Sequence, residues 1–401
     1  MTTLVPRNAG DVTDAVRWAV AEGASLEVLA GGTRRGLGRP VDALHVLDMS
    51  ALKGVVAHEP EELILTALPA TPLAEIEALL QSRNQCLAFE PPHLSTGNST
   101  LGGAVATAFS GPRRPKSGSV RDHVLGMTAV SGRGELFTGG GKVVKNVTGY
   151  DLPKLLTGSF GTLAVYTEIT VKVLPAPQDT RTLLIGGLDS GTAVRAMTAV
   201  LQSTADASGA CHVPAGIDVP GKLLNEPVTA LRLEGVTPSV EFRLARLWDQ
   251  LGTQGPLAVL DHDASIAFWK AIRDVTPFAE DPSRMLWRIS VPPARGAETL
   301  ARIGRSLPGA KAFLDWGGGL MWLQLEAVTE TAAAAEVAQK VRAALSEHNG
   351  HATLVRASED VRRAVEVFHP QALAVAALSN RVKAQFDPKQ VLNPGRMVAG
   401  V

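Results

Sequence analysis

The residues best suited to binding chemistry lie between Gly139 and Leu163, in the stretch GGGKVVKNVTGYDLPKLLTGSFGTL. Glycines gather at its start and near its end, where a backbone without Cβ atoms can approach a ligand closely and take positive φ. Between the glycines stand closely spaced polar side chains, namely Lys142, Lys145, Asn146, Thr148, Tyr150 and Asp151. Such a cluster suits a large, phosphate-bearing cofactor. Composition alone would favour an ordinary glycine-rich surface loop.

The bulk composition narrows the classes of protein to consider. A chain of 401 residues exceeds what one hydrophobic core usually holds, so two or more domains are expected. Hydrophobic residues make up 45% and charged residues 19%, which is typical of a globular protein. The formal net charge is +0, which argues against nucleic acid or an anionic membrane surface as a partner.

Cysteine usage and the N-terminus bear on location. Cys86 and Cys211 are the only two cysteines; they match no metal spacing and are too few for an iron–sulfur cluster held by four thiolates. A reducing cytoplasm is therefore expected. The first 16 residues do not resemble a signal peptide. No apolar run reaches the roughly 20 residues of a membrane span, so no transmembrane segment is expected.

The first half of the chain supplies the elements that must position this chemistry. Asp11 is predicted to cap a helix that ends at Gly23, before a short buried strand that runs directly into a glycine loop at 31–38. Strands near 44–48 and 63–68 and a helix from Thr71 follow. Residues 88–122 form a long loop, and loops of that length are usually functional.

The next elements lead to a domain boundary. Asp151 is predicted to cap a short helix ended by Gly158, and alternation over 163–173 indicates a half-buried strand. The following Leu174–Pro177 is the best candidate for a boundary.

The second half alternates strand and helix patterns, which favours an α+β arrangement with helices on one face of a sheet. Strands are predicted at 182–187, 228–235, 257–261, 285–291, 311–315, 320–326 and 352–356. Helices are predicted at 191–203, 238–251, 263–274, 328–347 and 359–368, with a last one ending at Phe386.

Five blocks in a fixed order give the chain a family resemblance. They are Ala30–Thr33, Ser99–Gly103, Gly118–Asp122 with Gly126, Lys142–Leu163 and Phe386–Gly395. Together they resemble flavoproteins with the vanillyl-alcohol-oxidase (PCMH-type) FAD domain, and in particular the FAD-binding E subunits of bacterial glycolate oxidases. The resemblance implies an FAD-binding domain over 1–175, an α+β cap domain with a mainly antiparallel sheet over 178–380, and a tail, 381–401, that returns to the FAD domain.

The resemblance also implies a set of FAD-binding residues. The pyrophosphate would lie in the first glycine loop, held by backbone N–H groups, and the second loop would run beside the pyrophosphate and the isoalloxazine. Noncovalent FAD is expected, because no histidine stands in the first glycine loop. The implied residues are Gly31, Gly32, Thr33, Arg34, Thr100, Gly102, Gly103, Thr107, Ser110, Gly111, Gly118, Val120, Gly161, Thr162, Val165, Ile169 and Asn393.

The second half departs from catalytic relatives. These carry a metal and base motif, H-x-G-D-G-N-x-H, and the nearest segment here is Trp316–Trp322, in which tryptophans replace both histidines and the aspartate is missing. Tryptophan can neither ligate a metal nor accept a proton, so no metal site is expected.

Other residues could serve a substrate. A tryptophan–arginine spacing, Trp269-x-x-x-Arg273, resembles the helix that supplies an arginine to the substrate carboxylate, although a surface arginine is an equally good interpretation. Arg288 is a weaker candidate for the same role. Candidate bases are His262, His351 and His369, each more often structural than catalytic.

Two functions from different classes follow from the resemblance. In the first, the chain is the FAD-binding subunit of a 2-hydroxyacid (glycolate) dehydrogenase or oxidase, working with a sister FAD subunit and an iron–sulfur subunit that takes the electrons. In the second, it is a non-catalytic subunit that carries FAD or supports assembly. A stand-alone oxidase has no specific support. The expected location is cytoplasmic, or peripheral at the inner membrane through the complex.

Overall fold

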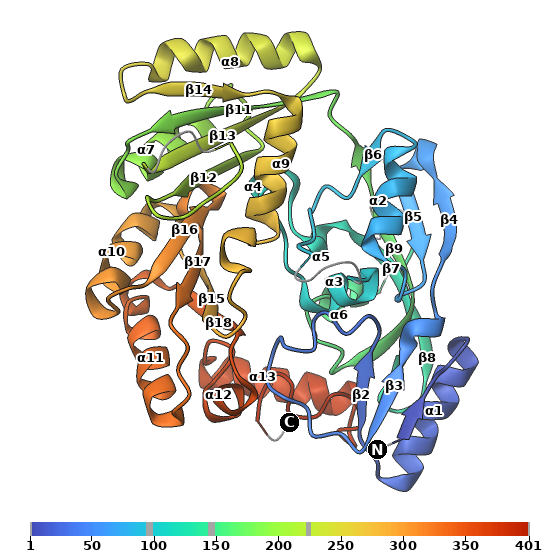
Figure 1. Cartoon of the computed structure of the whole chain (residues 1–401). Helices are drawn as coiled ribbons and strands as arrows, with labels where there is room; N and C mark the ends of the chain where they lie inside the picture. Colours follow the sequence, from blue (N-terminus) through green and yellow to red (C-terminus); the bar gives the residue numbers. More distant parts are fainter. Residues whose placement is uncertain (1, 94–98, 143–148, 222–225, 400–401) are drawn as a thin grey trace. The chain divides into compact units, whose positions relative to one another are not determined.

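The computed structural model describes residues 2–93, 99–142, 149–221 and 226–399, which form two compact units (Figure 1). The first unit combines Met1–Ser110, Gly118–Ala176 and Pro370–Val401, and the second combines Gly111–Ser117 and Pro177–His369. Three of the polar residues singled out in the sequence, Lys145, Asn146 and Thr148, lie outside the described residues.

A small parallel sheet begins the first unit. Strand β3 (His45–Asp48) lies between β1 (Thr2–Leu4) and β2 (Leu26–Leu29), and both pair with it in parallel. Helix α1 (Ala9–Glu22) connects the outer strands. It ends as predicted at Gly23, whose φ is 65° and whose N–H donates to the carbonyl of Ala19.

A five-stranded antiparallel sheet forms the rest of this unit, in the order β4-β5-β9-β7-β8. Its strands are β4 (Val55–Glu59), β5 (Ile64–Ala67), β7 (Val124–Ser131), β8 (Leu136–Gly140) and β9 (Ala164–Lys172). The short β6 (Gln85–Cys86) and β10 (Leu174–Pro175) pair separately. Helices of the unit are α2 (Leu73–Gln81), α3 (Leu101–Thr107), α5 (Val120–His123), α6 (Leu152–Leu156) and α13 (Leu373–Phe386).

The C-terminal residues pack against the start of the chain within this unit. After α13, Leu392 forms a parallel bridge with Leu26 of β2, and the N–H of Asn393 donates to the carbonyl of Leu26 at 2.9 Å. Val391 and Leu392 are buried in the same core cluster as Val16 and Leu47. The tail therefore acts as an extra edge of the small parallel sheet.

The second unit is built on an eight-stranded antiparallel sheet, in the order β14-β11-β13-β12-β16-β17-β15-β18. Its strands are β11 (Asp179–Gly186), β12 (Gly209–Val213), β13 (Val228–Gly235), β14 (Leu257–Leu260), β15 (Met285–Ser290), β16 (Lys311–Asp315), β17 (Leu320–Leu325) and β18 (His351–Arg356). Its helices are α4 (Arg114–Ser117), α7 (Ser190–Leu201), α8 (Thr237–Leu251), α9 (His262–Arg273), α10 (Gly296–Ser306), α11 (Thr331–Ala343) and α12 (Glu359–Ala364).

The two faces of this sheet differ in chemistry. On one face, Leu183, Leu231 and Leu323 share a hydrophobic core with residues of α7, α8, α10 and α11. Because side chains alternate along a strand, their neighbours Thr182 and Arg232 point to the other face. We call this the second sheet face. Helix α9 lies against it, since the indole N–H of Trp269 donates to Thr182 Oγ1 at 2.9 Å.

Most elements match the prediction, and the differences have physical reasons. Helix α1 begins earlier than predicted, because Asn8 rather than Asp11 is the N-cap, and its side chain accepts the N–H of Asp11. Strand β9 is not half-buried: it is the middle strand of its sheet, with Val165 in one core cluster and Tyr166 in another. The prediction of one long loop over residues 88–122 was wrong, because the short helices α3, α4 and α5 lie within it. The strands β1, β4, β7, β8 and β12 and the helix α10 were also not predicted.

Candidate cofactor-binding site

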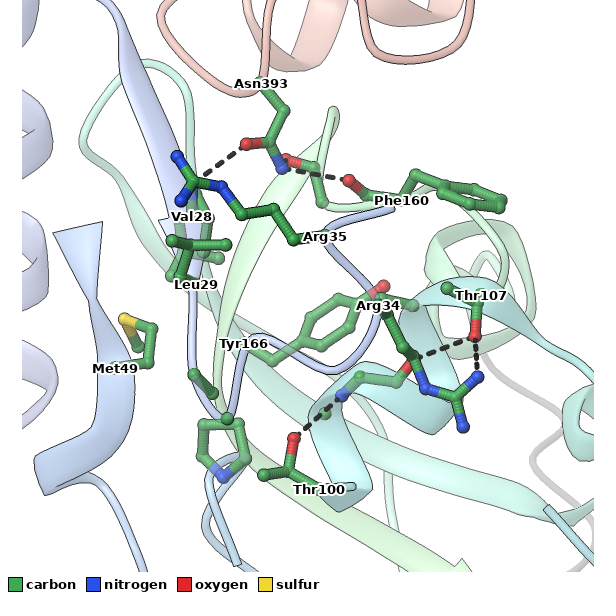
Figure 2. A pocket seen from close by; sticks show the side chains of 18 of the residues that line it. Val28, Leu29, Arg34, Arg35, Met49, Thr100, Thr107, Phe160, Tyr166 and Asn393 are labelled. Atoms are coloured by element: carbon green, nitrogen blue, oxygen red, sulfur yellow. Dashed lines mark hydrogen bonds between the residues drawn. The ribbon is translucent and has the colours of Figure 1, made fainter. Parts of the chain in front are cut away.

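A pocket in the first unit gathers parts of both glycine loops and the C-terminal tail (Figure 2). It encloses about 770 Å³ of empty space, part of which is open to solvent. Its wall is formed by residues 28–35, by α3 and the preceding Thr100, by the turn before β9, and by Asn393 and Arg396 of the tail. Segments far apart in the sequence therefore converge on one cavity.

The first glycine loop leaves room for a ligand at its backbone. Gly32 has a φ of 71°, and a Cβ placed there would meet no atom within 4 Å. A positive φ favours glycine, and the open space beside it lets a ligand approach the main chain. A side chain at this position would extend into the open space that the loop now offers.

The glycines of the second loop are required for a different reason, which is packing within the protein. A Cβ on Gly102 would lie 2.8 Å from Pro69 Cβ and 2.9 Å from its carbonyl oxygen, so this glycine is required by packing within the protein. A Cβ on Gly103 would lie 3.3 Å from Arg34 Cδ, so this glycine makes space for the arginine. Thr100 caps α3 by accepting the N–H of Gly103.

Asn393 connects three segments of the wall through its side chain. Its Oδ1 accepts the N–H of Val28 at 2.8 Å, and its Nδ2 donates to the carbonyls of Phe160 at 2.9 Å and Gly161 at 3.3 Å (Figure 2). Gly161 must lack a side chain, because a Cβ there would lie 2.7 Å from Asn393 Nδ2. The amide of Asn393 therefore holds the wall of the pocket together. It would serve a ligand indirectly, by positioning the other lining residues.

The C-terminal tail also holds the first glycine loop in place through hydrogen bonds of Arg396. Arg396 Nη2 donates to the carbonyl of Arg34 at 3.0 Å, and the carbonyl of Arg396 accepts the N–H of Arg39 at 2.9 Å. The tail is itself held by Lys383, whose Nζ donates to Asp387 at 2.6 Å and to the carbonyls of Thr162 and Leu392. Burial lowers the pKa of Lys383, and Asp387 opposes that shift.

Two adjacent arginines in the loop have different surroundings. Arg34 is buried, with 7% of its surface exposed, and its guanidinium donates to Thr107 Oγ1 at 3.1 Å and to the carbonyl of Pro92 at 2.8 Å. Burial lowers the pKa of Arg34 to about 10. Arg35 instead forms a two-pronged ion pair with Glu27, at 2.9 and 2.7 Å.

The structure brings eleven of the predicted cofactor residues together. The pocket is lined by Gly31, Gly32, Thr33, Arg34, Thr100, Gly102, Gly103, Thr107, Gly161, Val165 and Asn393. The other six do not line it: Ser110, Gly111, Gly118, Val120, Thr162 and Ile169. Ser110 Oγ accepts the N–H of Val120, Thr162 Oγ1 donates to the carbonyl of Ser159, and Ile169 is in the core.

Some lining residues carried no recognisable signal in the sequence. Tyr166 lines the pocket, although the half-buried strand predicted over 163–173 gave no reason to single it out. Its hydroxyl donates to the carbonyl of Leu156 at 2.6 Å, and burial raises the pKa of Tyr166 to about 12. Other lining residues without a sequence signal are Val28, Leu29, Met49, Pro69, Ala106 and Arg396.

In the second unit, Trp316 occupies a strained turn beside the second sheet face. Its φ is 54°, a left-handed conformation that is uncommon for a large side chain. The indole N–H donates to the carbonyl of Gly111 at 3.0 Å. The guanidinium carbons of Arg114 and Arg288 lie 4.4 and 5.1 Å from the ring centroid. Two cations therefore adjoin the tryptophan that stands where catalytic relatives are expected to have histidine.

The arginine predicted for the substrate carboxylate already has a carboxylate partner. Arg273 Nε and Nη2 donate to the two carboxylate oxygens of Asp274, at 2.9 and 3.0 Å. Arg288 lies in strand β15, directly opposite Trp322 of β17. Burial, and repulsion from Arg114, lower the pKa of Arg288 to about 10.

All three candidate histidines belong to the second unit. His262 Nδ1 lies 3.1 Å from the backbone nitrogen of Thr180 and 3.3 Å from Asp179 Oδ1, in a contact typical of a structural histidine. His369 Nδ1 lies 3.4 Å from the backbone nitrogen of Ala352, the residue after His351. Burial, followed by repulsion from Arg288 and His369, lowers the pKa of His351. Within the described ranges, no group of three or more histidine, cysteine or acidic side chains is arranged to hold a metal ion.

Comparison with known proteins agrees with the nature of this pocket. Residues 2–140 match the model of the FAD binding domain. Over 385 residues the chain is 35% identical to the glycolate oxidase subunit GlcE of Escherichia coli (strain K12), covering 96% of this chain and 95% of that protein. It is 31% identical over 187 residues to the glycolate oxidase subunit GlcD of Bacillus subtilis (strain 168), covering 45% of this chain and 38% of that protein.

Solved structures share the fold at low sequence identity. A p-cresol methylhydroxylase with substrate bound has a TM-score of 0.70 at 13% identity, covering 98% of this chain and 88% of that chain. An alkyldihydroxyacetonephosphate synthase has a TM-score of 0.71 at 16% identity, covering 98% and 76%. The fold and the FAD binding domain define a PCMH-type flavoprotein, and the sequence relatives are FAD-linked oxidoreductases. Within it, the chain belongs to the GlcE family of glycolate oxidase subunits.

The relatives and the helices bear on assembly and location. Both glycolate oxidase relatives are named as subunits, so the family works in multi-subunit enzymes. None of the helices in the described ranges is long and apolar enough to cross a membrane.

Proposed function

We propose that the pocket of the first unit holds FAD noncovalently. The observation that carries this proposal is the convergence of residues 28–35, α3, the turn at Phe160–Gly161 and Asn393 on one cavity. The open backbone at Gly32 suits a phosphate group, and the apolar side chains of Leu29, Met49 and Val165 suit a flat ring. The buried cation of Arg34 also fits an anionic cofactor.

We further propose that the chain serves a 2-hydroxyacid dehydrogenase or oxidase, with glycolate as the expected substrate. When bound, FAD supplies the two-electron acceptor for oxidising the alcohol carbon. The chain's own residues hold the cofactor and fix the loop around it. Electrons would pass to a partner that carries iron–sulfur clusters, because two cysteines cannot hold a cluster that needs four thiolates. A sister FAD subunit completes the complex, in the cytoplasm or at the membrane surface.

A second candidate function is that of a non-catalytic, FAD-carrying subunit whose sister subunit performs the oxidation. The second unit favours it. Trp316 and Trp322 offer neither a metal ligand nor a base, and Arg273 is neutralised by Asp274. A general base must reach the substrate hydroxyl. Within the described ranges, no group of three or more histidine, cysteine or acidic side chains is arranged to hold a metal ion that could assist such a step.

Two measurements on the purified full-length chain test these proposals. A flavin absorption spectrum is expected after reconstitution with FAD; a chain that takes up no FAD contradicts both functions and leaves only a role in assembly. Glycolate is then added without oxygen, with acetate as a control that lacks the hydroxyl. Bleaching of the flavin by glycolate alone shows a complete active site, and an unchanged spectrum supports the non-catalytic function.

A further inference from the structure

Arg34 lines the pocket, and its side chain is a buried cation. It is 7% exposed, and its hydrogen-bond partners, Thr107 Oγ1 and the carbonyl of Pro92, are both neutral. Its Nε is buried and has no hydrogen-bond partner among the described residues. Burial lowers its pKa, with no nearby carboxylate offsetting the shift in the part of the chain described. The group is therefore left with both charge and a donor unsatisfied.

The neighbouring Arg35 shows that the lack of a carboxylate partner is specific to position 34 and is not shared by the whole loop. Arg35 pairs with Glu27 through two hydrogen bonds, and the side chain of Glu27 is only 4% exposed. Each arginine lines the same pocket. The protein thus supplies a carboxylate to one arginine and none to the next.

Burying an ion without a counter-charge costs free energy in the folded protein, and a bound anion recovers it. We propose that Arg34 is the counter-charge for the pyrophosphate of FAD, and that the pocket thereby selects a cofactor bearing phosphate. The inference rests on the proposed FAD function and names the side chain that recognises the anionic part.

The lining residues support a position for the phosphates near Arg34. Thr107 contacts the guanidinium, and Thr100 and the open backbone of Gly32 also line the pocket. Figure 2 shows Leu29 and Met49 on the opposite side from Arg34 and Thr107. The apolar side suits a ring, and the polar side suits the charged linker of a dinucleotide.

The test compares wild-type chain, stripped of flavin, with Arg34→Met, Arg34→Lys and the matched control Arg35→Met. Dissociation constants are measured for FAD, for ADP, for inorganic pyrophosphate in competition with FAD, and for riboflavin, which has no phosphate. Arg34→Met is expected to weaken FAD, ADP and pyrophosphate by about 10- to 100-fold, the range for a lost charge-assisted hydrogen bond. Riboflavin is expected to bind within about threefold of wild type, since it has no anion to lose.

The thermal stability of the flavin-free protein provides a second readout. Arg34→Met is expected to leave Tm unchanged or raise it, because a buried uncompensated charge is removed. Arg35→Met is expected to lower Tm, because Glu27 loses its partner, and to weaken ADP far less than Arg34→Met does. Arg34→Lys keeps the charge and is expected to bind ADP with an affinity close to that of wild type. This comparison with wild type tests the charge even if the methionine variant does not fold.

The outcomes separate this inference from the proposed function. Wild-type protein that binds no FAD contradicts the proposed function itself. Wild-type protein that binds FAD while Arg34→Met binds ADP and pyrophosphate equally well overturns only the role of Arg34. A variant that loses riboflavin and FAD equally, with ADP unchanged, would place the guanidinium at the ring and also overturn the proposal.

Discussion

The pocket of the first unit and the second sheet face of the second unit differ in how their charged side chains are paired and in how much open space they leave. In the pocket, Arg34 is buried among neutral partners and the backbone of Gly32 faces open space. On the second sheet face, Arg232 lies 4.7 Å from the ring of Trp269, and Arg113 forms a two-pronged pair with Glu234. One region keeps a cavity beside a buried cation with neutral hydrogen-bond partners, and the other packs Trp269 against Arg232 and pairs Arg113 with Glu234.

This difference teaches that holding a flavin and turning over a substrate are separate properties of the chain. A ligand site needs unfilled volume and unsatisfied groups, and the pocket has both. The region around Trp316 has neither a described metal cluster nor an available arginine at position 273. The two regions can therefore be tested independently, because substitutions in one should leave the other intact.

The largest effect is expected from Gly161→Val in the pocket wall. A Cβ at Gly161 would lie 2.7 Å from Asn393 Nδ2, and the φ of 69° is unfavourable for a branched residue. Overpacking and backbone strain together should cost about 4 kcal/mol. Denaturant unfolding should show this loss, and FAD uptake should disappear. Flavin bound at the wild-type level would show that this turn is not part of the site.

The second prediction concerns charge compensation in the other region. Burial alone would raise the pKa of Glu234, but attraction to Arg232 and Arg113 outweighs it and lowers the pKa to about 2. The folded pKa lies below the unfolded value of about 4.3, so the stabilisation is complete above about pH 4.3 and is lost as pH falls towards about 2. It amounts to roughly 3 kcal/mol. Glu234→Gln should lose that stability at pH 7 and remove this part of the acid dependence, as measured by urea unfolding across this pH range.

The control for Glu234→Gln is FAD binding at pH 7. The variant should bind FAD with wild-type affinity as long as it is folded, because Glu234 belongs to the second unit. A weakened flavin affinity in fully folded protein would break the independence of the two regions.

Asn393→Ala, a substitution in the pocket wall, should reduce stability by less than the two preceding variants. The variant leaves the N–H of Val28 and the carbonyl of Phe160 without their side-chain partner. Unsatisfied buried groups of this kind should cost about 2 kcal/mol, measured by urea unfolding. FAD affinity should fall as well, because the wall that Asn393 holds together would loosen. Asn393→Asp keeps the acceptor for Val28 and should be intermediate.

The smallest effect is expected from Trp316→Phe. This variant keeps a ring between Arg114 and Arg288 but loses the hydrogen bond to the carbonyl of Gly111, which should cost about 1 kcal/mol. Neither FAD binding nor the response to glycolate should change. A changed rate of flavin reduction by glycolate would show that Trp316 takes part in the reaction, and would bring the two regions together.

The elements around the pocket were predictable where caps and glycines leave local signals, whereas α3 in the pocket wall was predicted as part of a loop. Asp151 caps α6 as predicted, accepting the N–H of Lys154, and the glycine at position 23 ends α1. Strand β12 was not predicted, since all five of its residues, including Cys211 and His212, are buried and no alternation appears. Helix α10 begins and is interrupted by glycine, which weakens a helical pattern.

The site itself was predictable in its loops and not in its contacts. The order of glycines identified residues 31–34 and 100–107, but nothing local distinguishes Arg34 from Arg35. Their difference depends on Glu27, on Thr107 and on the carbonyl of Pro92, which only the tertiary structure brings near. Likewise, Gly102 was predicted to face the cofactor, and its lack of a Cβ is required by Pro69. Whether the other predicted residues contact FAD stays a prediction.

The bridge between Leu392 and Leu26 has a consequence for how the protein is made. A ribosome finishes β2, both glycine loops and the five-stranded sheet long before it reaches Val391, and the whole of residues 177–369 comes between. At about 5–20 residues per second, roughly 10–45 s pass between Ala176 and Asn393. The nascent first unit waits through that time with an open edge on its parallel sheet and an unfinished wall. Flavin loading is thus a late event, set by the completion of the polypeptide and not by the first domain to emerge.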